Sequence, residues 1–292
     1  MTDGPRPLRL GLRSFAAHEL VVMAVVNVTP DSFYDRGSTF VAAAAIDAAE
    51  RALDEGADIV DIGGVRAGVG PAVAVAEEIE RIRPVVAGLR ARRPDAVISV
   101  DTWRGEVGRA AVDAGADLLN DPWEGHDPDL VAVAAETGVG LVCAHAGHLP
   151  PRTDPRYPHY DDVTADVVAT VTGLAARAVT AGVRADGILV DPAHDFGKNT
   201  VQSLEVTRRL DELVATGWPV LVAVSNKDFV GETLDLPVGG RLPGTLAATA
   251  VSAWLGARVF RAHNVPETRQ VLDMVASIRG DRPPARAERG RP

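Results

Sequence analysis

The feature that most limits the fold of this chain is an alternation, repeated eight times, of a short β-branched run and a longer Ala-rich segment of helical period. Such runs are typical of buried parallel strands joined by helices. We expect strands at 21–26, 59–62, 97–100, 117–119, 139–144, 187–190, 220–224 and 258–260. We expect helices at about 41–55, 74–92, 104–114, 127–136, 161–181, 201–215, 242–254 and 265–278.

Eight units predict a single (β/α)8 barrel, an α/β fold, over residues 20–279. An open doubly wound sheet would usually have fewer strands and a glycine-rich fingerprint after the first, and none follows Val26. Within residues 1–19 we expect a strand or hairpin that closes the lower mouth of the barrel. Residues 280–292 are rich in Pro, Arg and Gly, and we expect them to form a flexible tail.

Charge and cysteine content narrow the functional classes. The formal net charge of −10 disfavours a general surface for nucleic acid or anionic membranes, although it leaves room for a local phosphate pocket. The single cysteine, Cys143, lies in an apolar run and is expected to fill core space. The apolar run at 20–26 is too short to span a bilayer and lacks a signal-peptide layout. We therefore expect a cytoplasmic protein that binds neither nucleic acid nor membrane.

Polar side chains stand at the end of every expected strand. One such residue would be a cap or a solvated turn, but active sites of this barrel lie at the carboxyl ends of the strands, where a full set converges on one mouth. The set consists of Asn27, Asp61, Asp101, Asn120, His145, Asp191, Lys227, Arg261 and His263.

The residue types suit a small nitrogen heterocycle. Three aspartates, Asp61, Asp101 and Asp191, offer acceptors. Asn120 beside them offers both a donor and an acceptor, as an amino-amidine edge of a pterin or purine requires. Lys227 supplies a donor for a ring carbonyl or nitrogen.

Three further residues suit an anion on that heterocycle. Arg261 and His263 are alternate residues of one strand, so they lie on one side of it and form an anion clamp. Asn27 offers a carbonyl oxygen to Mg²⁺, which shares its oxygen ligands with substrate phosphates. The expected ligand is therefore a heterocycle that carries a phosphate or pyrophosphate.

Stretches in chain order resemble the successive motifs of dihydropteroate synthase over roughly residues 23–278. They are Asn27-Val-Thr-Pro-Asp-Ser-Phe33, Asp61-Ile-Gly-Gly64, Ile98-Ser-Val-Asp-Thr102, Asn120-Asp121, Asp191-Pro with Phe196-Gly-Lys198, Ser225 with Lys227, and Arg261-Ala-His263. The resemblance implies a TIM barrel, usually a homodimer, that joins a pterin methyl pyrophosphate to p-aminobenzoate with Mg²⁺ as cofactor.

The resemblance also assigns roles to matching positions. The pterin site would comprise Asp101, Asn120, Asp191, Phe196 and Lys227. The pyrophosphate and Mg²⁺ site would comprise Asn27, Arg261 and His263. The catalytic set would comprise Asp35, which matches the aspartate of the family's mobile first loop, with Lys227, Arg261 and His263.

The motifs of the second substrate depart from the family. Ala67 and Gly68 replace the Thr and Arg that help to enclose p-aminobenzoate. Arg66 stands two positions before the place of that arginine, and the sequence leaves open whether it takes over the role. Asn226 and Asp228 replace an Arg and a Ser. Two carboxylates about 4 to 5 Å apart at an effective dielectric near 20 would repel by roughly 3 to 4 kcal/mol. The lost arginine hydrogen bond would add roughly 1.5 to 3 kcal/mol.

Two other departures touch the same region. Ala144 and Ala146 flank His145 where the family favours Met and another bulky residue, and Ala193-His194-Asp195 replaces glycine-rich residues. The whole pattern predicts a homologue that keeps a pterin and pyrophosphate site but has weak or absent standard activity, like the divergent second paralogue of actinobacteria. The alternatives are an active dihydropteroate synthase of folate biosynthesis, condensation with a different amine, and a corrinoid methyltransferase on a related barrel.

Overall fold

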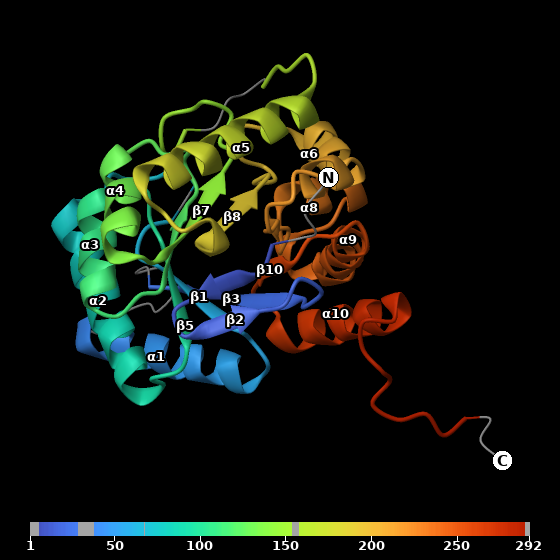
Figure 1. The fold of residues 1–292 in the computed structure, drawn as a ribbon, viewed down its shortest axis with the longest axis horizontal. Coiled ribbons are helices and arrows are strands. Elements are labelled where there is room, and N and C mark those ends of the chain that lie inside the picture. The colour runs from blue at the N-terminus through green and yellow to red at the C-terminus, as the bar shows by residue number, and fades with distance from the viewer. Residues whose placement is uncertain (1–5, 29–37, 67, 154–157, 290–292) are drawn as a thin grey trace.

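A ring of parallel strands forms the centre of the computed structural model, which describes residues 6–28, 38–66, 68–153 and 158–289 (Figure 1). Within these residues eight strands pair in the order β8-β7-β6-β5-β4-β3-β10-β9. Their bounds are β3 Val21–Asn27, β4 Ile59–Gly63, β5 Val97–Asp101, β6 Leu118–Asp121, β7 Gly140–Ala144, β8 Ile188–Asp191, β9 Leu221–Val222 and β10 Val259–Ala262. A parallel bridge between Val190 and Val220 joins the ends of this order. The predicted (β/α)8 barrel is confirmed.

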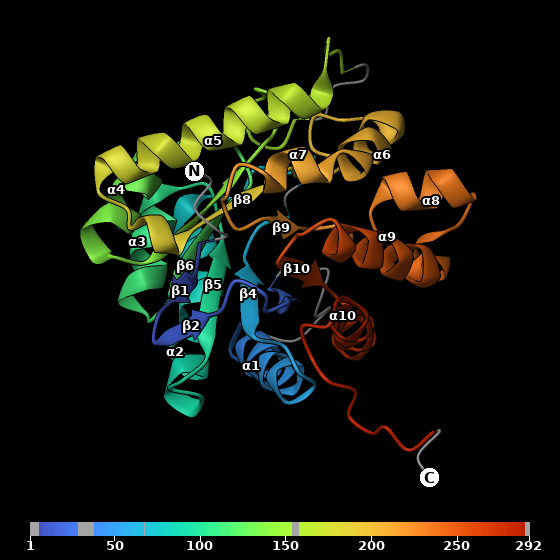
Figure 2. The same cartoon turned by 45° about the vertical axis from the view of Figure 1, so that its right-hand side comes forward.

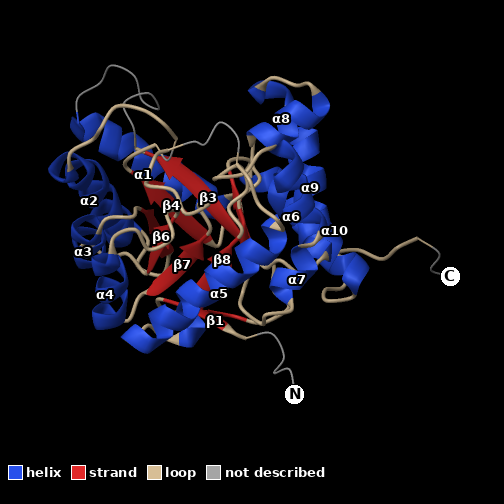
Figure 3. Cartoon of the chain, turned by 90° about the horizontal axis from the view of Figure 1, so that it is seen from above, coloured by secondary structure: helices blue, strands red, loops and turns tan. Residues whose placement is uncertain are grey.

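Helices surround the strands, as the view from above shows (Figure 3). They are α1 Ser38–Asp54, α2 Val75–Arg92, α3 Gly105–Asp113, α4 Pro128–Thr137, α5 Val163–Ala181, α6 Thr200–Arg208, α7 Leu210–Val214, α8 Asp228–Leu234, α9 Leu242–Trp254 and α10 Val265–Arg279, with 3₁₀ helices η2 Ala185–Gly187 and η3 Val238–Gly240. Side-chain caps start several of them: Asp127 accepts from Asp129 N, and Asp162 accepts from Ala165 N at 2.9 Å. Gly138 and Gly182, at φ of 74° and 110°, end α4 and α5 in the left-handed conformation that glycine adopts readily.

Two expectations about elements are wrong in detail. The single helix expected over 201–215 is broken at Arg209, whose φ of −105° and ψ of 25° separate α6 from α7. The guanidinium there binds Asp162, Glu205 and Glu212, so ion pairs favour the break. The strand expected at 220–224 forms a ladder with its neighbour only over β9. A polar loop follows β9, and α8 begins directly after that loop.

An N-terminal hairpin closes the bottom of the barrel. Strands β1 (Leu8–Leu10) and β2 (Arg13–Phe15) pair antiparallel, with Leu8 opposite Phe15. Leu8, Leu10 and Phe15 are buried in one cluster with the first residues of the barrel strands. Because those residues point into the ring at its lower end, the hairpin covers apolar surface that would otherwise meet water. Figure 3 shows β1 below the strands of the ring.

Helix α5 has the length and apolar composition to cross a membrane. Its Val167, Val171 and Leu174 are nevertheless buried in the main core, where the helix covers β7 and β8 (Figure 2). Cys143 lies in the same core and burial raises the pKa of its thiol, so the prediction that it fills core space is confirmed. Residues 281–289 are exposed and run away from the barrel (Figure 1).

Candidate active site

Arg261 lies between two aspartates at the carboxyl end of the barrel. Its Nε donates to Asp61 Oδ2 at 2.6 Å, and a terminal nitrogen donates to Asp101 Oδ2 at 2.9 Å. The Asp61 side chain is fully buried and also accepts from Ser99 Oγ at 2.6 Å and from Asn120 Nδ2 at 3.1 Å. Asp61 is therefore an anchor that orients Arg261 and Asn120, while Asp101 lies nearer the mouth.

The charges of this cluster largely cancel. Burial raises the pKa of Asp101 to about 7 against the opposing effect of Arg261, and burial raises the pKa of Asp191 to about 6. The expected clamp of Arg261 and His263 is thus modified, because two carboxylates already engage the guanidinium. Arg261, Asp61 and Asp101 come from three different strands, and no spacing in the sequence indicates that they pair.

His263 follows Arg261 by two residues, and Asn27 ends the neighbouring strand β3. The Nδ1 of His263 is 3.0 Å from Ser225 Oγ, which also accepts from the His263 backbone N–H at 3.2 Å. Burial lowers the pKa of His263, and the positive charges of Arg261 and Lys227 lower it further. His263 and Asn27 both line one cavity of about 310 Å³. Asn27 is exposed at the end of β3, so its side-chain oxygen is available to a hard cation and fits the oxygen preference of Mg²⁺.

Lys227 lies over an aromatic wall. Its Nζ is 4.3 Å from the centroid of the Phe196 ring and donates to His194 O at 2.5 Å. Phe196 in turn meets Trp123 edge-on, with centroids 5.3 Å apart. Burial lowers the pKa of Lys227, while Asp195 and Asp191 act against that shift. This part of the mouth offers an ammonium donor and apolar ring faces to a flat heterocycle, as the predicted pterin site requires.

Trp123 and Trp103 belong to the site, although sequence reasoning did not select them. Both are buried in one apolar cluster with Val65 and Ala146. Alanines flank His145 where the family favours bulky side chains. The two tryptophans pack in the cluster to which one of these alanines, Ala146, belongs. Their position directly after two strand ends was the signal that could have identified them.

The loop after β9 is held by a partner that the sequence did not indicate, Arg241 at the start of α9. Arg241 donates to Asn226 O at 2.9 Å and to Asp228 Oδ1 at 2.7 Å. The Asp228 side chain is 78% exposed, and Asn226 adopts a left-handed φ of 58°. The repulsion expected from Asp228 is therefore too large. For an exposed, paired carboxylate the appropriate scale is about 1 kcal/mol or less.

The other altered positions lie on the loop after β4. Arg66 and Gly68 are exposed, and Gly68 O accepts from Arg152 Nε at 3.1 Å. Arg152 also donates to Pro71 O at 2.5 Å, so it ties this loop to the loop after β7. Ala67 and Asp35 lie outside the described residues.

The loop after β8 keeps a shape suited to glycine without containing glycine at the key positions. Ala193 and Asp195 have φ of 47° and 66°. His194 between them is fully buried, stacks on Phe229 at 5.4 Å and lies 2.9 Å from Thr207 Oγ1 through Nε2. Packing and hydrogen bonds thus hold a backbone conformation that is costly for non-glycine residues.

The mouth of this barrel combines aspartate, asparagine and lysine groups with an aromatic wall. These features define a class of barrel suited to binding a flat polar heterocycle. The family model described as pterin binding enzyme matches residues 23–263. The chain belongs to this family.

Known relatives narrow the relationship. The chain is 57% identical over 282 residues to a Mycobacterium leprae protein named inactive dihydropteroate synthase 2, covering 95% of this chain and 97% of the relative. It is 37% identical to Escherichia coli dihydropteroate synthase, over 87% of this chain and 90% of that enzyme. The structure of Xanthomonas albilineans dihydropteroate synthase with 4-aminobenzoic acid superposes with a TM-score of 0.86 at 35% identity, covering 94% and 98% of the two chains. This protein is a divergent dihydropteroate synthase homologue.

Proposed function

We propose that this protein binds a pterin that carries a pyrophosphate, and that its condensation of this pterin with 4-aminobenzoate is weak or absent. The observation that carries the proposal is a contrast within one mouth. Pterin-side groups are assembled around Arg261 and Lys227, whereas Arg241 holds the loop of Asn226 and Asp228. The Mycobacterium leprae relative, named inactive, supports the second half of the proposal.

The pterin would lie against Phe196, with Lys227 and Asn120 donating to it and Asp191 accepting from its amino-amidine edge. Asp101 would complete the edge, because its pKa of about 7 lets it offer either a proton or a lone pair near neutral pH. Lys227 would leave His194 O for a ring atom. These groups come from the ends of four strands, β5, β6, β8 and β9, so the barrel itself fixes their spacing.

The pyrophosphate would lie near Asn27, Arg261 and His263. Since Asp61 and Asp101 compensate the charge of Arg261, this subsite lacks a free positive charge. Mg²⁺ held through Asn27 would supply charge stabilisation for the leaving pyrophosphate. His263 would donate or accept through its ring, and Arg261 would orient the phosphate by hydrogen bonds rather than by net charge.

The second subsite would bind 4-aminobenzoate poorly because the family arginine is missing at Asn226. A lost charge-assisted hydrogen bond costs roughly 1.5 to 3 kcal/mol, and the exposed Asp228 adds about 1 kcal/mol or less. Since 1.4 kcal/mol is about tenfold, the combined loss in affinity is roughly 10-fold to 10³-fold. The arginine therefore matters more than the aspartate.

Calorimetric titration with the pterin diphosphate, with and without Mg²⁺, tests binding. We expect saturable binding that weakens when Mg²⁺ is removed. Lys227→Met should weaken binding by about tenfold or more, because it removes a charged donor worth about 1.5 to 3 kcal/mol. Failure of the unmodified protein to bind the pterin would reject the proposal.

Diphosphate release with 4-aminobenzoate tests turnover against an ordinary dihydropteroate synthase. We expect turnover reduced by roughly tenfold or more, with Asn226→Arg recovering more activity than Asp228→Ser. Their combination with the family's loop in place of residues 65–69 should improve it further. Ordinary turnover by the unmodified chain would instead establish an active enzyme of folate biosynthesis, and turnover with another amine alone would redefine the substrate.

We further propose a cytoplasmic homodimer. Helices α9 and α10 lie side by side (Figure 2) and expose Val251 and Trp254 from the first, and Met274 and Ile278 from the second. Large apolar side chains gathered on adjacent helices are typical of a protein interface.

A further inference from the structure

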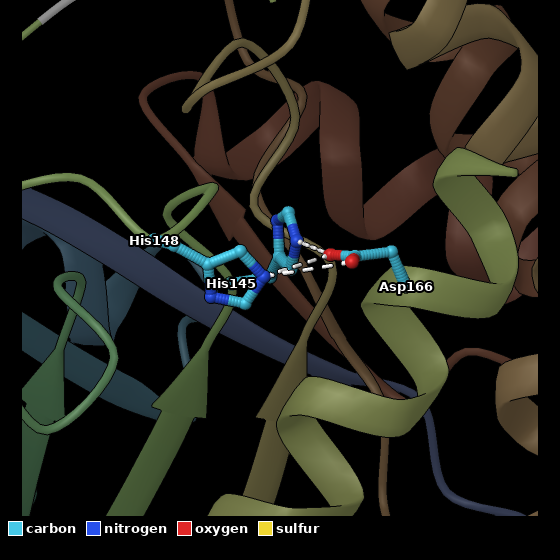
Figure 4. A group of neighbouring side chains, drawn as sticks. All are labelled: His145, His148 and Asp166. Atoms are coloured by element: carbon cyan, nitrogen blue, oxygen red, sulfur yellow. Dashed lines mark hydrogen bonds and ion pairs between the residues drawn. The ribbon is translucent and has the colours of Figure 1, made fainter. Parts of the chain in front are cut away.

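A second constellation lies after β7, beside the loop that carries Phe196. His145 directly follows β7, His148 lies three residues later, and Asp166 comes from the first turn of α5. One ligand atom from each lies within 4.8 Å of the other two. Figure 4 shows the two rings and the carboxylate directed at one another.

We propose that His145, His148 and Asp166 form a site for a divalent transition metal ion of the zinc class. Asp166 Oδ1 lies 2.7 Å from His145 Nε2 and 3.3 Å from His148 Nε2. Tetrahedral coordination with bonds of 2.0 to 2.2 Å places ligand atoms about 3.3 Å apart. The His148–Asp166 distance already fits, and the His145–Asp166 contact would have to open by about half an ångström. Two imidazoles and one carboxylate favour zinc-class ions over Mg²⁺, which prefers oxygen ligands.

The surroundings of His148 favour a cation at this point. Its Nδ1 lies 3.2 Å from Glu124 Oε2, so a proton on Nδ1 is donated to that carboxylate. Nε2 faces the two oxygens of Asp166 at 3.3 and 3.5 Å, and in the neutral ring with its proton on Nδ1 the Nε2 lone pair is free to bind a cation there. A metal ion between them would satisfy both, and a carboxylate on the outer nitrogen is the usual support of a ligating histidine.

The backbone is also arranged to present these ligands. Glu124 accepts from the backbone N–H of Ala146 at 2.7 Å and of His148 at 3.0 Å, which holds the loop over Asp166. Lys198 Nζ lies 2.6 Å from His145 Nδ1 and fixes the plane of the buried ring. His145 Nε2 then faces Asp166 at 2.7 Å. A metal ion bound to Nε2 would release that proton to solvent, and the proton shared between Lys198 and Nδ1 would lie on Nδ1, so the ring would coordinate as a neutral imidazole.

The remaining coordination positions face open space. His148 and Asp166 line a cavity of about 620 Å³, together with Tyr160, Asp161 and Gly197. Three protein ligands with an accessible fourth position are typical of zinc sites that retain a water molecule. The cavity offers room for such a water and for a small ligand beside it.

Zn²⁺ titration of the metal-free, untagged protein, in competition with a chromophoric chelator, tests this proposal. We expect one Zn²⁺ per chain, no competition from excess Mg²⁺, and visible absorption bands of a four- or five-coordinate ion when Co²⁺ replaces Zn²⁺. His148→Ala should weaken Zn²⁺ binding by at least about tenfold, as loss of even a supporting group does at zinc sites. Because His148 is largely exposed, this variant is expected to fold.

His159→Ala is the matched control, since His159 lines the same cavity but lies outside the cluster. It should bind Zn²⁺ like the unmodified chain, while Asp166→Asn should lose affinity like His148→Ala. The site is rejected if the unmodified protein binds no stoichiometric Zn²⁺, if His148→Ala retains full affinity, or if His159→Ala loses it.

Discussion

At the scale of single residues, His194 in the loop after β8 makes the stability of the protein depend on pH. Burial lowers the pKa of His194 to about 3, and the charges of Lys227 and Lys198 contribute. In the unfolded chain its pKa is about 6.5. Between these values the unfolded state takes up a proton that the folded state refuses, so the stability that depends on neutral His194 falls as the pH drops below about 6.5.

His194→Gln should reduce this pH dependence, because glutamine can bond Thr207 without titrating. From pH 7 to pH 5 the unmodified chain should lose about 2 kcal/mol more unfolding free energy than the variant does. Urea unfolding at both pH values measures the difference. His159→Gln, at an exposed position, should behave like the unmodified chain; equal losses in all three proteins would contradict this account.

The sequence predicted the members of the site better than their partnerships. Polar residues from four strands meet because parallel strands share one carboxyl edge. His145, which was expected with them, instead lies in a separate cluster with His148 and Asp166. Arg261 was expected to meet a ligand, but it binds Asp61 and Asp101 from strands far away in the chain. Arg241, which holds Asn226 and Asp228, belongs to no pattern of spacing, since only the folded loop brings it there.

At the scale of elements, alternation located all eight strands because burial on both faces demands continuous apolar runs. Boundaries were harder where tertiary contacts decide them. The break at Arg209 depends on Asp162, which lies 47 residues away in the sequence. Helix α8 has only seven residues after a polar loop, too few to show a clear helical period.

The hairpin of β1 and β2 should contribute measurably to stability. Leu8 is fully buried at the bottom of the barrel, so Leu8→Ala should lower the unfolding free energy by about 2 to 5 kcal/mol through lost contacts and a cavity. Leu12 in the same hairpin is 94% exposed, and Leu12→Ala should change it by less than about 0.5 kcal/mol. Chemical denaturation compares the two; similar losses would show that the hairpin does not act as a plug.

At the scale of the whole molecule, the exposed apolar face of α9 and α10 predicts self-association. Trp254, 60% exposed, contributes its largest side chain. Trp254→Glu should convert the dimer to a monomer, because a carboxylate would be buried without a partner. Sedimentation velocity measures the change, with Leu12→Glu as the control. A monomeric unmodified chain, or dissociation by the control, would refute the proposed interface.

The junction between β8 and β9 gives the barrel one weak seam. Elsewhere neighbouring strands share ladders, whereas here Val190 and Val220 form a single bridge, supported by the Val190 N–H bond to Pro219 O. Asp191 and Lys227 follow the strands on either side of it. Few hydrogen bonds must break for β8 and β9 to separate locally, so the free energy of local opening should be lower here than at the other strand pairs. A ligand that contacts both residues would act as a clasp across the seam and would slow amide exchange there.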